Sequence, residues 1–233
     1  MSPAANLGIH APMRRAALAW VLLGIGSACS ATPQEPSAPI QVAAPEQPSA
    51  DVEEPAAHPE PSPFPTFADE FTAALLSKQD LDRYVAPELG VFLLTNPGAF
   101  HVVSHFDSFA ELRSEATPYF LERLGSDCRD AAWFTSDDHV PTYSCDTEQY
   151  DIQAPCVRGT IRSAALSKLI SLNVQYELIP ADEGERRIPA AKRSEALASH
   201  YLFMQPYTLG FYFGQVEGSW KLLWIDTIEP CSA

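Results

Sequence analysis

The sequence has few basic residues. Its 233 residues include 15 Lys and Arg against 30 Asp and Glu, so the net charge is −15. The first 28 residues carry two bases and no acid, and residues 30–65 carry six acids and no base, which leaves −11 on residues 66–233. A surface with that charge repels phosphate backbones and is not attracted to an anionic lipid leaflet. We therefore expect no nucleic-acid partner.

The sequence also lacks the short motifs by which several classes of site are recognised. It contains no GxSxG nucleophile elbow, no Walker A loop, no HExxH zinc motif and no GxGxxG dinucleotide fingerprint. No CxxC pair occurs either. The sequence therefore gives no motif-based catalytic residue, metal ligand or cofactor. We expect a binding or interaction module without catalytic activity.

No apolar run near the amino terminus is long enough to cross a bilayer. The run AALAWVLLGIGSA follows Arg14 and Arg15 and spans 13 residues, whereas a bilayer core needs about 20. A basic start, a short apolar core and small residues before a cleavage site are typical of a secretory signal. We therefore predict a signal peptide over residues 1–28 and an exported protein.

The end of that segment, GSAC, resembles the lipobox of bacterial lipoproteins. The resemblance implies that Cys29 is acylated, becomes the first residue of the mature protein and anchors it to a bacterial membrane. Ser27 and Ala28 fit the family pattern, while Gly26 stands where the family prefers Leu. Ser30 in place of an Asp implies sorting to the outer membrane, with the domain in the periplasm or at the cell surface.

Cys29 has two other interpretations. An ordinary signal peptidase would cut the same bond and leave the thiol unmodified, and a disulfide would use Cys29 as one partner. The rest of the chain holds four cysteines, an even set, and a fifth cysteine in an exported protein needs a reason. Acylation supplies that reason.

A Pro-rich segment separates the anchor from the rest of the chain. Residues 30–65 hold ten Pro, no Gly and a single aromatic residue, Phe64. Such a composition cannot bury enough apolar surface to offset the entropy of ordering, so we predict a disordered linker over 29–65. Extended at about 3.1 Å per residue, it would hold a domain up to about 110 Å from its anchor.

The remaining segment, 66–233, is expected to be a globular domain with its own cysteines. These cysteines are Cys128, Cys145, Cys156 and Cys231. An exported domain meets an oxidising compartment, so we predict two disulfides, and three pairings are compatible with the sequence. Zinc is the rival interpretation, but spacings of 17 and 11 residues do not match a zinc ribbon.

Hydrophobic periodicity predicts a mixture of helices and strands in this domain. Thr66 is the expected N-cap of the first helix, and Ser108 with Glu111 forms a capping-box pattern. The stretch 165–179 is compatible with a helix or with a helix followed by a strand. Helices are expected over 66–80, 81–85, 107–113, 117–124 and 191–200, and strands over 90–96, 97–106, parts of 126–160, 207–215 and 219–228.

The carboxyl-terminal strands are expected to form a hairpin. Val216, Glu217 and Gly218 separate them, which matches a three-residue loop that ends in a G1 bulge. Alternation places Leu209, Phe211 and Phe213 on one face of the first strand, and Trp220, Leu222 and Trp224 on one face of the second.

The order of these elements resembles the nuclear transport factor 2 and ketosteroid isomerase superfamily. The resemblance rests on FADEFTAALLSKQDLDRYV, PGAF and FGQVEGSWKLLWID, and covers residues 66–228. It implies an α+β fold in which a curved mixed or antiparallel sheet carries its helices on the concave face, like a cone. Members include isomerases, dehydratases and non-catalytic binding modules, so the fold alone does not decide the function.

Three functions follow as hypotheses. The first is a non-catalytic, membrane-anchored lipoprotein that binds an envelope protein or a small hydrophobic ligand. The second is an isomerase or dehydratase that uses an apolar pocket in the cone. The third is a structural component of an envelope complex that binds through an exposed apolar patch.

Several residues have the right chemistry for a site, although none matches a catalytic motif. His101 and His105 are four apart in an expected strand, and His139 follows two acids, which would suit a metal or acid–base site. A proton-transfer site needs a carboxylate in an apolar pocket opposite a donor. The residues of these types are His101, His105, Asp137, Asp138 and His139 for the first kind of site, and Asp107, Asp226, Tyr119 and Tyr212 for the second.

Overall fold

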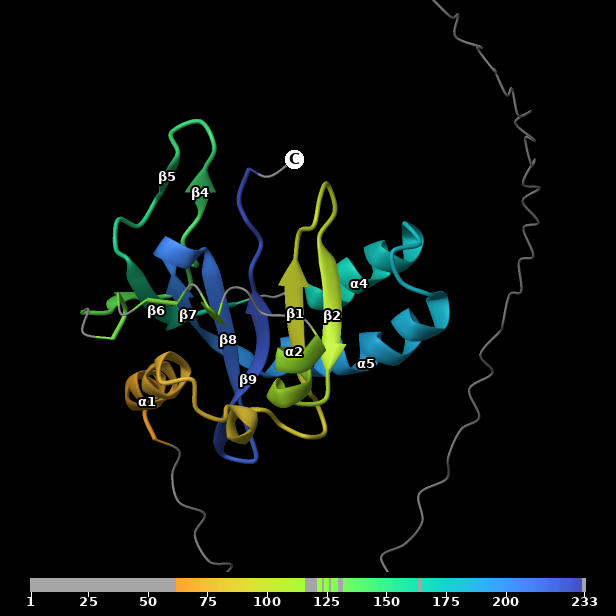
Figure 1. Cartoon of the computed structure of the whole chain (residues 1–233), viewed down its shortest axis with the longest axis horizontal. Coiled ribbons are helices and arrows are strands. Elements are labelled where there is room, and N and C mark those ends of the chain that lie inside the picture. Colours follow the sequence, from red (N-terminus) through yellow and green to blue (C-terminus); the bar gives the residue numbers. More distant parts are fainter. Residues whose placement is uncertain are drawn as a thin grey trace, which may run out of the picture. The chain divides into compact units, whose positions relative to one another are not determined.

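A seven-stranded sheet forms the centre of the domain in the computed structural model (Figure 1). The structure describes residues 62–115, 121–122, 124–125, 127–129, 132–162 and 165–231. The predicted signal peptide, Cys29 and nearly all of the predicted linker lie outside these residues, as do residues 117–120 and 123 of the predicted helix over 117–124. Within the described ranges, no helix is long and apolar enough to cross a bilayer.

The sheet is mixed, with strand order β2-β1-β9-β8-β7-β6-β3. β1 runs parallel to β9, and β3 runs parallel to β6, while the other neighbours are antiparallel. A separate small hairpin pairs β4 with β5. The strands are β1 (Val91–Thr95), β2 (Val102–Phe106), β3 (Phe134–Ser136), β4 (Tyr143–Ser144), β5 (Gln149–Tyr150), β6 (Cys156–Thr160), β7 (Ala198–Met204), β8 (Leu209–Val216) and β9 (Ser219–Asp226).

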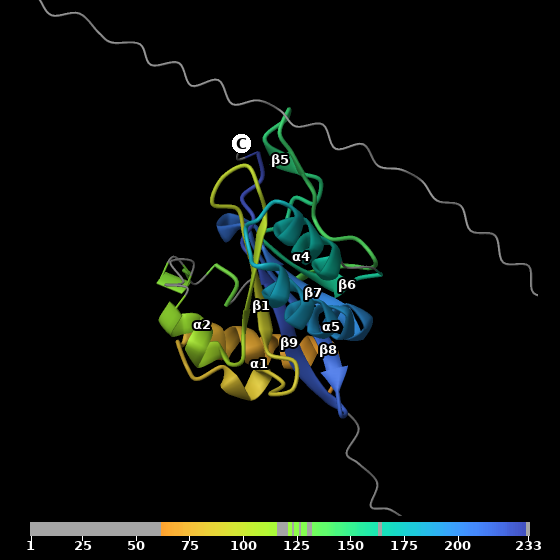
Figure 2. The same cartoon turned by 90° about the vertical axis from the view of Figure 1, so that its right-hand side faces the viewer.

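Helices cover both faces of the sheet. The helices that do so are α1 (Phe64–Leu76), α2 (Phe109–Glu115), α4 (Leu166–Gln175) and α5 (Ala181–Leu197), and the described residues also form 3₁₀ turns η1 (Asp82–Tyr84) and η2 (Gln205–Tyr207). α1 and α2 pack on one face around Phe71, Leu112 and Phe211. α4 and α5 pack on the other face around Phe92 and Ile170. Figure 2 shows the two helical layers on opposite sides of the strands.

The α+β class and the mixed sheet are thus confirmed. The expected placement of the helices on a single concave face describes α1 and α2 but not α4 and α5. The sheet needs the second layer because Phe92, Leu94 and Trp224 give it a second apolar surface, and exposing that surface to water would be unfavourable.

A row of aromatic side chains crosses five strands on the α4–α5 side. Tyr201 is the register partner of Tyr212, Tyr212 of Trp224, Trp224 of Phe92, and Phe92 of His105. Tyr212 stacks on Trp224 with ring centroids 4.6 Å apart, and Phe92 lies 4.5 Å from the ring of His105. Cross-strand pairs of this kind stabilise a sheet beyond the area that they bury.

A β-bulge in β9 changes which residues share a face. Phe213 pairs with Leu222 whereas Tyr212 pairs with Trp224, so Leu223 is an extra residue between them. Leu222 therefore packs with α1, while Leu223 and Trp224 both pack on the α4–α5 side. The prediction that Trp220, Leu222 and Trp224 share a face is wrong for this reason.

The predicted helix over 191–200 is also wrong at both ends. The helix α5 begins ten residues earlier, at Ala181, and the chain turns into the central strand β7 at Ala198. Two charge pairs at i and i+4 support α5, namely Asp182–Arg186 and Glu183–Arg187. Gly184 and Pro189 inside the helix obscure it in the sequence, although an ideal Cβ on Gly184 would lie 2.2 Å from Cγ2 of Val174 in α4.

The two predicted helix starts differ in outcome. α1 begins at Phe64, two residues before the predicted cap Thr66, and Pro63 is its N-cap. α2 begins as predicted, because Ser108 Oγ accepts a hydrogen bond from the Glu111 N–H at 3.0 Å. The Glu111 carboxylate accepts one from the Asp107 N–H at 2.6 Å, which makes a near-complete capping box.

The terminal hairpin is confirmed, but its loop is one residue shorter than predicted. Val216 pairs with Ser219, so only Glu217 and Gly218 form the turn. Their φ angles are 49° and 74°. Two successive positive φ values define a type I′ turn, which matches the right-handed twist of the strands.

We expect Glu217→Asn to stabilise the protein. Asn adopts a positive φ more readily than Glu, and Asn-Gly is the preferred type I′ pair, so we expect the free energy of unfolding to rise by about 0.5–1 kcal/mol. Urea unfolding at neutral pH measures this as a higher midpoint with an unchanged slope. Glu217→Ala is the control and should give no gain; equal gains from both variants would contradict the turn assignment.

Candidate functional site

Two disulfides bond all four cysteines of the domain. Cys128 is bonded to Cys156, and Cys145 is bonded to Cys231. The prediction of two disulfides is therefore confirmed, and no thiolate of these cysteines is left for zinc. Disulfides of this kind indicate an oxidising, extracytoplasmic compartment. In the chain-entropy model, loops of 28 and 86 residues are worth about 3–4 and 4–5 kcal/mol.

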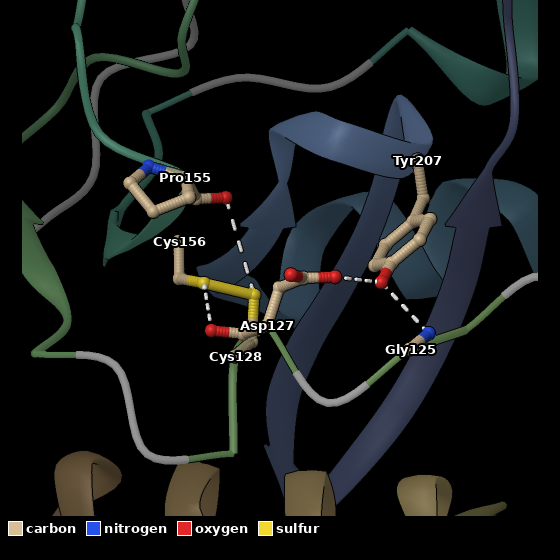
Figure 3. Close-up of a disulfide and its surroundings, with 6 residues drawn as sticks. All are labelled: Gly125, Asp127, Cys128, Pro155, Cys156 and Tyr207. Atoms are coloured by element: carbon tan, nitrogen blue, oxygen red, sulfur yellow. Dashed lines mark hydrogen bonds between the residues drawn. A yellow bond between two sulfur atoms is a disulfide. The ribbon is translucent and has the colours of Figure 1, made fainter.

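The first disulfide lies beside a polar contact that fixes Tyr207 (Figure 3). The Tyr207 hydroxyl donates a hydrogen bond to the Asp127 carboxylate and accepts one from the Gly125 N–H at 2.7 Å. Desolvation and the bond to the Asp127 carboxylate raise the pKa of Tyr207, so the phenol stays protonated. Its hydroxyl is therefore directed at the loop that carries Cys128.

The second disulfide borders a pocket of about 480 Å³. We call it the tyrosine pocket. The small hairpin β4–β5, the turn η2 and the carboxyl-terminal segment together form its walls. Its lining residues are Tyr143, Cys145, Glu148, Tyr150, Gln205, Pro206, Tyr207, Thr208, Glu229, Pro230 and Cys231. Its volume lies within the range usual for small-molecule sites.

Two of its tyrosines are packed against each other and against the sheet. The rings of Tyr143 and Tyr150 lie 5.0 Å apart at an interplanar angle of 73°. Tyr150 lies 5.4 Å from Phe203 of β7 at 69°. The Tyr150 hydroxyl donates to Thr208 Oγ1 at 3.5 Å, and burial raises the pKa of Tyr150. Tyr150 is therefore held in a fixed position in the wall of the pocket.

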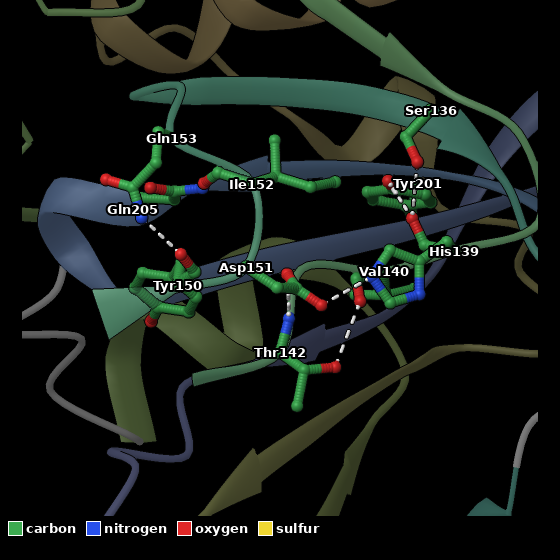
Figure 4. A network of polar contacts seen from close by, with 10 residues as sticks. All are labelled: Ser136, His139, Val140, Thr142, Tyr150, Asp151, Ile152, Gln153, Tyr201 and Gln205. Carbon is green, nitrogen blue, oxygen red and sulfur yellow. Dashed lines mark hydrogen bonds and ion pairs between the residues drawn. The ribbon is translucent and has the colours of Figure 1, made fainter. Parts of the chain in front are cut away.

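A polar network holds the hairpin to the sheet (Figure 4). The Asp151 carboxylate accepts a hydrogen bond from the Thr142 N–H at 2.9 Å and lies 2.6 Å from Nε2 of His139. The hydroxyl of Tyr201, in β7, donates to the His139 carbonyl at 2.6 Å, and burial raises the pKa of Tyr201 to about 12. Gln205 Nε2 donates to the carbonyl of Ile152 at 2.6 Å.

His139 does not form the site expected from its neighbours in sequence. Its partner is Asp151, whereas Asp138 pairs with Arg162 on the surface. His139 and Asp151 are both roughly half exposed. The His139 carbonyl accepts a hydrogen bond from Ser136 Oγ, and the Asp151 carboxylate accepts one from the Thr142 N–H. Within the described ranges, the hydrogen-bond partner of the His139 ring is Asp151, so the pair joins two segments of the chain that flank the hairpin.

His101 and His105 do not combine into a site either. The His105 ring packs against Phe92 at an interplanar angle of 46°, and its Nε2 lies 2.8 Å from the Leu89 carbonyl. His101 precedes β2, and its carbonyl accepts a hydrogen bond from Asn173. Among the described residues, no group of three or more His, Cys, Asp or Glu could hold a metal ion.

Of the four candidates for a proton-transfer site, the structure brings Asp226 and Tyr212 together. Asp226 lies on the apolar face, in a row with Phe203, Gly210 and Leu94. Gly210 leaves room for the pair, because an ideal Cβ there would lie 3.0 Å from the Tyr212 ring and 3.5 Å from Cβ of Asp226. Asp107 is exposed, and Tyr119 lies outside the described residues.

The surroundings of Asp226 change its chemistry. Burial raises the pKa of Asp226 to about 6, against the opposing effects of the Ile228 N–H and the charge of His101. Burial, and then the nearby Asp226 carboxylate, raise the pKa of Tyr212. Tyr150 packs on Phe203, the register partner of Gly210, and Gly210 pairs with Asp226, so Asp226 lies behind the wall that Tyr150 forms. The same carboxylate makes a minor contribution to the raised pKa of Tyr150. Neither Asp226 nor Tyr212 belongs to the pocket lining.

A second pocket of about 320 Å³ lies between the end of α1 and α2. We call it the apolar pocket. The buried side chains of Leu75, Leu81 and Phe109 form its floor, and the exposed side chains of Lys78 and Arg113 stand at its rim. It is the smaller of the two, and Phe109 is the single aromatic side chain among the described residues that line it.

The sequence did not single out the three pocket tyrosines. Tyr143, Tyr150 and Tyr207 match no motif, and long-range pairing decides their positions. One local signal was present, since Tyr143 and Tyr150 flank Cys145 in YSCDTEQY. In an exported domain a disulfide ties such a segment to a distant one, so aromatic residues beside a cysteine are candidates for a site between the two segments.

We expect Asp226→Asn to stabilise the protein at neutral and higher pH. A carboxyl whose pKa rises from 3.8 unfolded to about 6 folded favours folding fully below pH 3.8, and this contribution is lost as the pH rises through about 6. At pH 8 the free energy of unfolding of the variant should exceed that of the wild type by about 2 kcal/mol, because a pKa change of this size corresponds to roughly 3 kcal/mol at most.

Urea unfolding between pH 4 and pH 8 measures this difference. The wild type should lose more stability over that window than the variant does. Asp107→Asn removes an exposed carboxylate and is the matched control, which should keep the wild-type pH profile. A variant that is less stable than the wild type at pH 8 would show that the Asp226 carboxylate is not desolvated.

Comparison with known proteins leaves this geometry as the main guide to function. No protein-family model, no curated protein and no solved structure matches the chain. Function therefore has to be inferred from the tyrosine pocket, the disulfides and the charge of the domain.

Proposed function

We propose that this chain is an exported, membrane-tethered binding domain that holds a small molecule in the tyrosine pocket. The observation that carries the proposal is the construction of that pocket. Its walls come from segments far apart in sequence, and the Cys145–Cys231 disulfide joins two of them covalently. A preformed pocket of this kind binds a ligand without the cost of ordering its own walls.

The tether is the second part of the proposal. Residues 1–28 act as the signal peptide, Cys29 carries the acyl chains, and the Pro-rich linker over 29–65 separates the anchor from the domain. Ser30 directs the lipoprotein to the outer membrane. Two disulfides support export, because they indicate an oxidising compartment. The GSAC resemblance supports acylation at Cys29.

Kinship with the nuclear transport factor 2 superfamily remains part of this proposal. A first helix that packs on a long terminal hairpin supports it, since Phe67 and Phe71 of α1 both contact Phe213 of β8. The helices α4 and α5 on the opposite face are additions to that pattern.

An enzyme of the isomerase or dehydratase type is the second candidate. The observation in its favour is the Asp226–Tyr212 pair, because a partly buried carboxyl with a pKa near 6 suits a general base. Against it, Asp226 and Tyr212 lie behind the pocket wall rather than in the lining. The binding domain is therefore the better-supported function.

Acylation of Cys29 can be tested by mass. The mature protein isolated from membranes should have the mass of a chain that starts at an acylated Cys29. After treatment with reductant, its mass should increase by the hydrogens that the reduction of two disulfides adds. Cys29→Ser should leave the protein in the soluble fraction with both disulfides intact. An unmodified, soluble wild-type protein that starts at Cys29 would contradict the tether.

Binding in the pocket can be tested with the soluble Cys29→Ser chain. Titration with a panel of small cationic, neutral and anionic molecules should shift the NMR resonances of Tyr143, Tyr150 and Thr208 for at least one class. Resonances of the apolar pocket, such as Leu81 and Phe109, serve as the internal control. A panel that shifts only the control residues, or none, would refute the tyrosine pocket as the binding site.

A further inference from the structure

We infer that the ligand of the tyrosine pocket is an organic cation that places an alkylated ammonium group against the tyrosine rings. This inference deepens the proposed function and rests on it. Three properties of the pocket support it: the charge of the lining, the direction of the tyrosine hydroxyls, and the volume.

The charge of the pocket favours a cation. Two acidic residues, Glu148 and Glu229, belong to the lining, and none of the described residues that line the pocket is Lys or Arg. The domain around it carries −11 over residues 66–233. A concave surface with low-dielectric walls concentrates such a field and raises the local concentration of cations. An anionic ligand would be repelled at the same place.

Asp226 adds to this field from behind the wall. Its carboxylate is close enough to the Tyr150 phenol to affect the pKa of Tyr150, although burial has the larger effect. No Lys or Arg forms an ion pair with Asp226 among the described residues. The Tyr150 ring packs on Phe203, the register partner of Gly210, and Gly210 pairs with Asp226. The carboxylate therefore lies on the sheet side of that ring and adds to the negative potential at the pocket.

The hydroxyl groups of two of the pocket tyrosines are already hydrogen-bonded within the protein. The Tyr207 hydroxyl is engaged with Asp127 and Gly125, and the Tyr150 hydroxyl with Thr208. Sugar recognition would draw on such hydroxyls as hydrogen-bond partners, whereas cation recognition uses the negative face of the ring. The near-perpendicular pair Tyr143 and Tyr150 adds two ring surfaces of different orientation at one corner. The combination favours an ammonium group over a sugar.

The volume of the pocket sets a lower limit on the size of the ligand. About 480 Å³ is more than a bare ammonium or metal ion fills, so the cation must be part of an organic molecule. Alkylated ammonium groups suit ring faces because they are weakly hydrated and lose little on leaving water. Choline is a suitable probe, since it combines a trimethylammonium group with a short hydroxylated chain.

The test compares choline with its uncharged isostere, 3,3-dimethylbutan-1-ol, on the full-length Cys29→Ser protein. Titration calorimetry and NMR report affinity and location. We expect choline to bind at the tyrosine pocket about tenfold more tightly than the alcohol, because cation–π attraction at a partly desolvated site contributes on the order of 1–2 kcal/mol. Added NaCl should weaken choline binding and leave the alcohol unaffected.

A pair of substitutions at Tyr143 locates the contact. Tyr143→Phe keeps the ring and should bind choline within about twofold of the parent, whereas Tyr143→Leu removes the ring and should weaken binding about five- to tenfold. Tyr143 lies on the two-residue strand β4 and is only partly buried, so both variants should fold. Circular dichroism and the melting temperature check that they do.

Several outcomes would overturn the inference. Equal binding of choline and the alcohol would show that the pocket does not recognise the positive charge. Binding of methyl glucosides in place of choline would show that it is a sugar site. Equal loss in Tyr143→Phe and Tyr143→Leu would show that the hydroxyl, not the ring, makes the contact. In each case a ligand still occupies the pocket, so the proposed function survives. Failure of every class in the panel refutes both.

Discussion

The fold depends on a sheet whose two faces are both apolar. Most residues of β1, β7, β8 and β9 are buried, and the bulge at Leu223 supplies further apolar side chains to the α4–α5 side. Each face loses water only if another element packs on it, and this burial is the main favourable term in folding. Helices α1 and α2 cover one face, and α4 and α5 cover the part of the other that β2, β1, β9 and β8 form. The part of the second face that these helices leave uncovered determines where the site lies.

That remaining part is covered by a loop and a minimal hairpin. Tyr201, Phe203 and Val157 pack under residues of the 140–154 segment, which contains only the two-residue strands β4 and β5. A hairpin of that size is not stable by itself. The Cys145–Cys231 disulfide and the hydrogen bonds of Asp151 hold it in place. A cover fixed by discrete bonds need not fill all the space around it, as close packing would, and the tyrosine pocket lies beside this cover, between the hairpin, η2 and the carboxyl-terminal segment.

Elements formed by interactions between neighbours in sequence could be predicted, whereas elements that depend on contacts between distant segments could not. The hairpin β8–β9 is visible in the sequence because its alternation and its turn are local. The helix α5 is not, since only Gly184, Ala191 and Ser194 are buried in it, and its support comes from charge pairs. β7 is apolar on both sides and has no alternation that separates it from a buried helix. The disulfides could be counted from the sequence, but their pairing required the fold. The pocket tyrosines required both the fold and the pairing.

Asp226 connects the stability of the domain with its site. Its position in the row between Gly210 and Leu94 is one where an apolar side chain would continue the core, and burial of its carboxylate is unfavourable at neutral pH. Gly210 in turn gives up a side chain on the same face, and the Tyr212 ring occupies the space. Two neighbouring positions thus depart from what packing alone favours, and both departures lie behind Tyr150. Departures of this kind are typical of positions kept for a function. The charge that they place behind the pocket wall is of the sign that a cation-binding site requires.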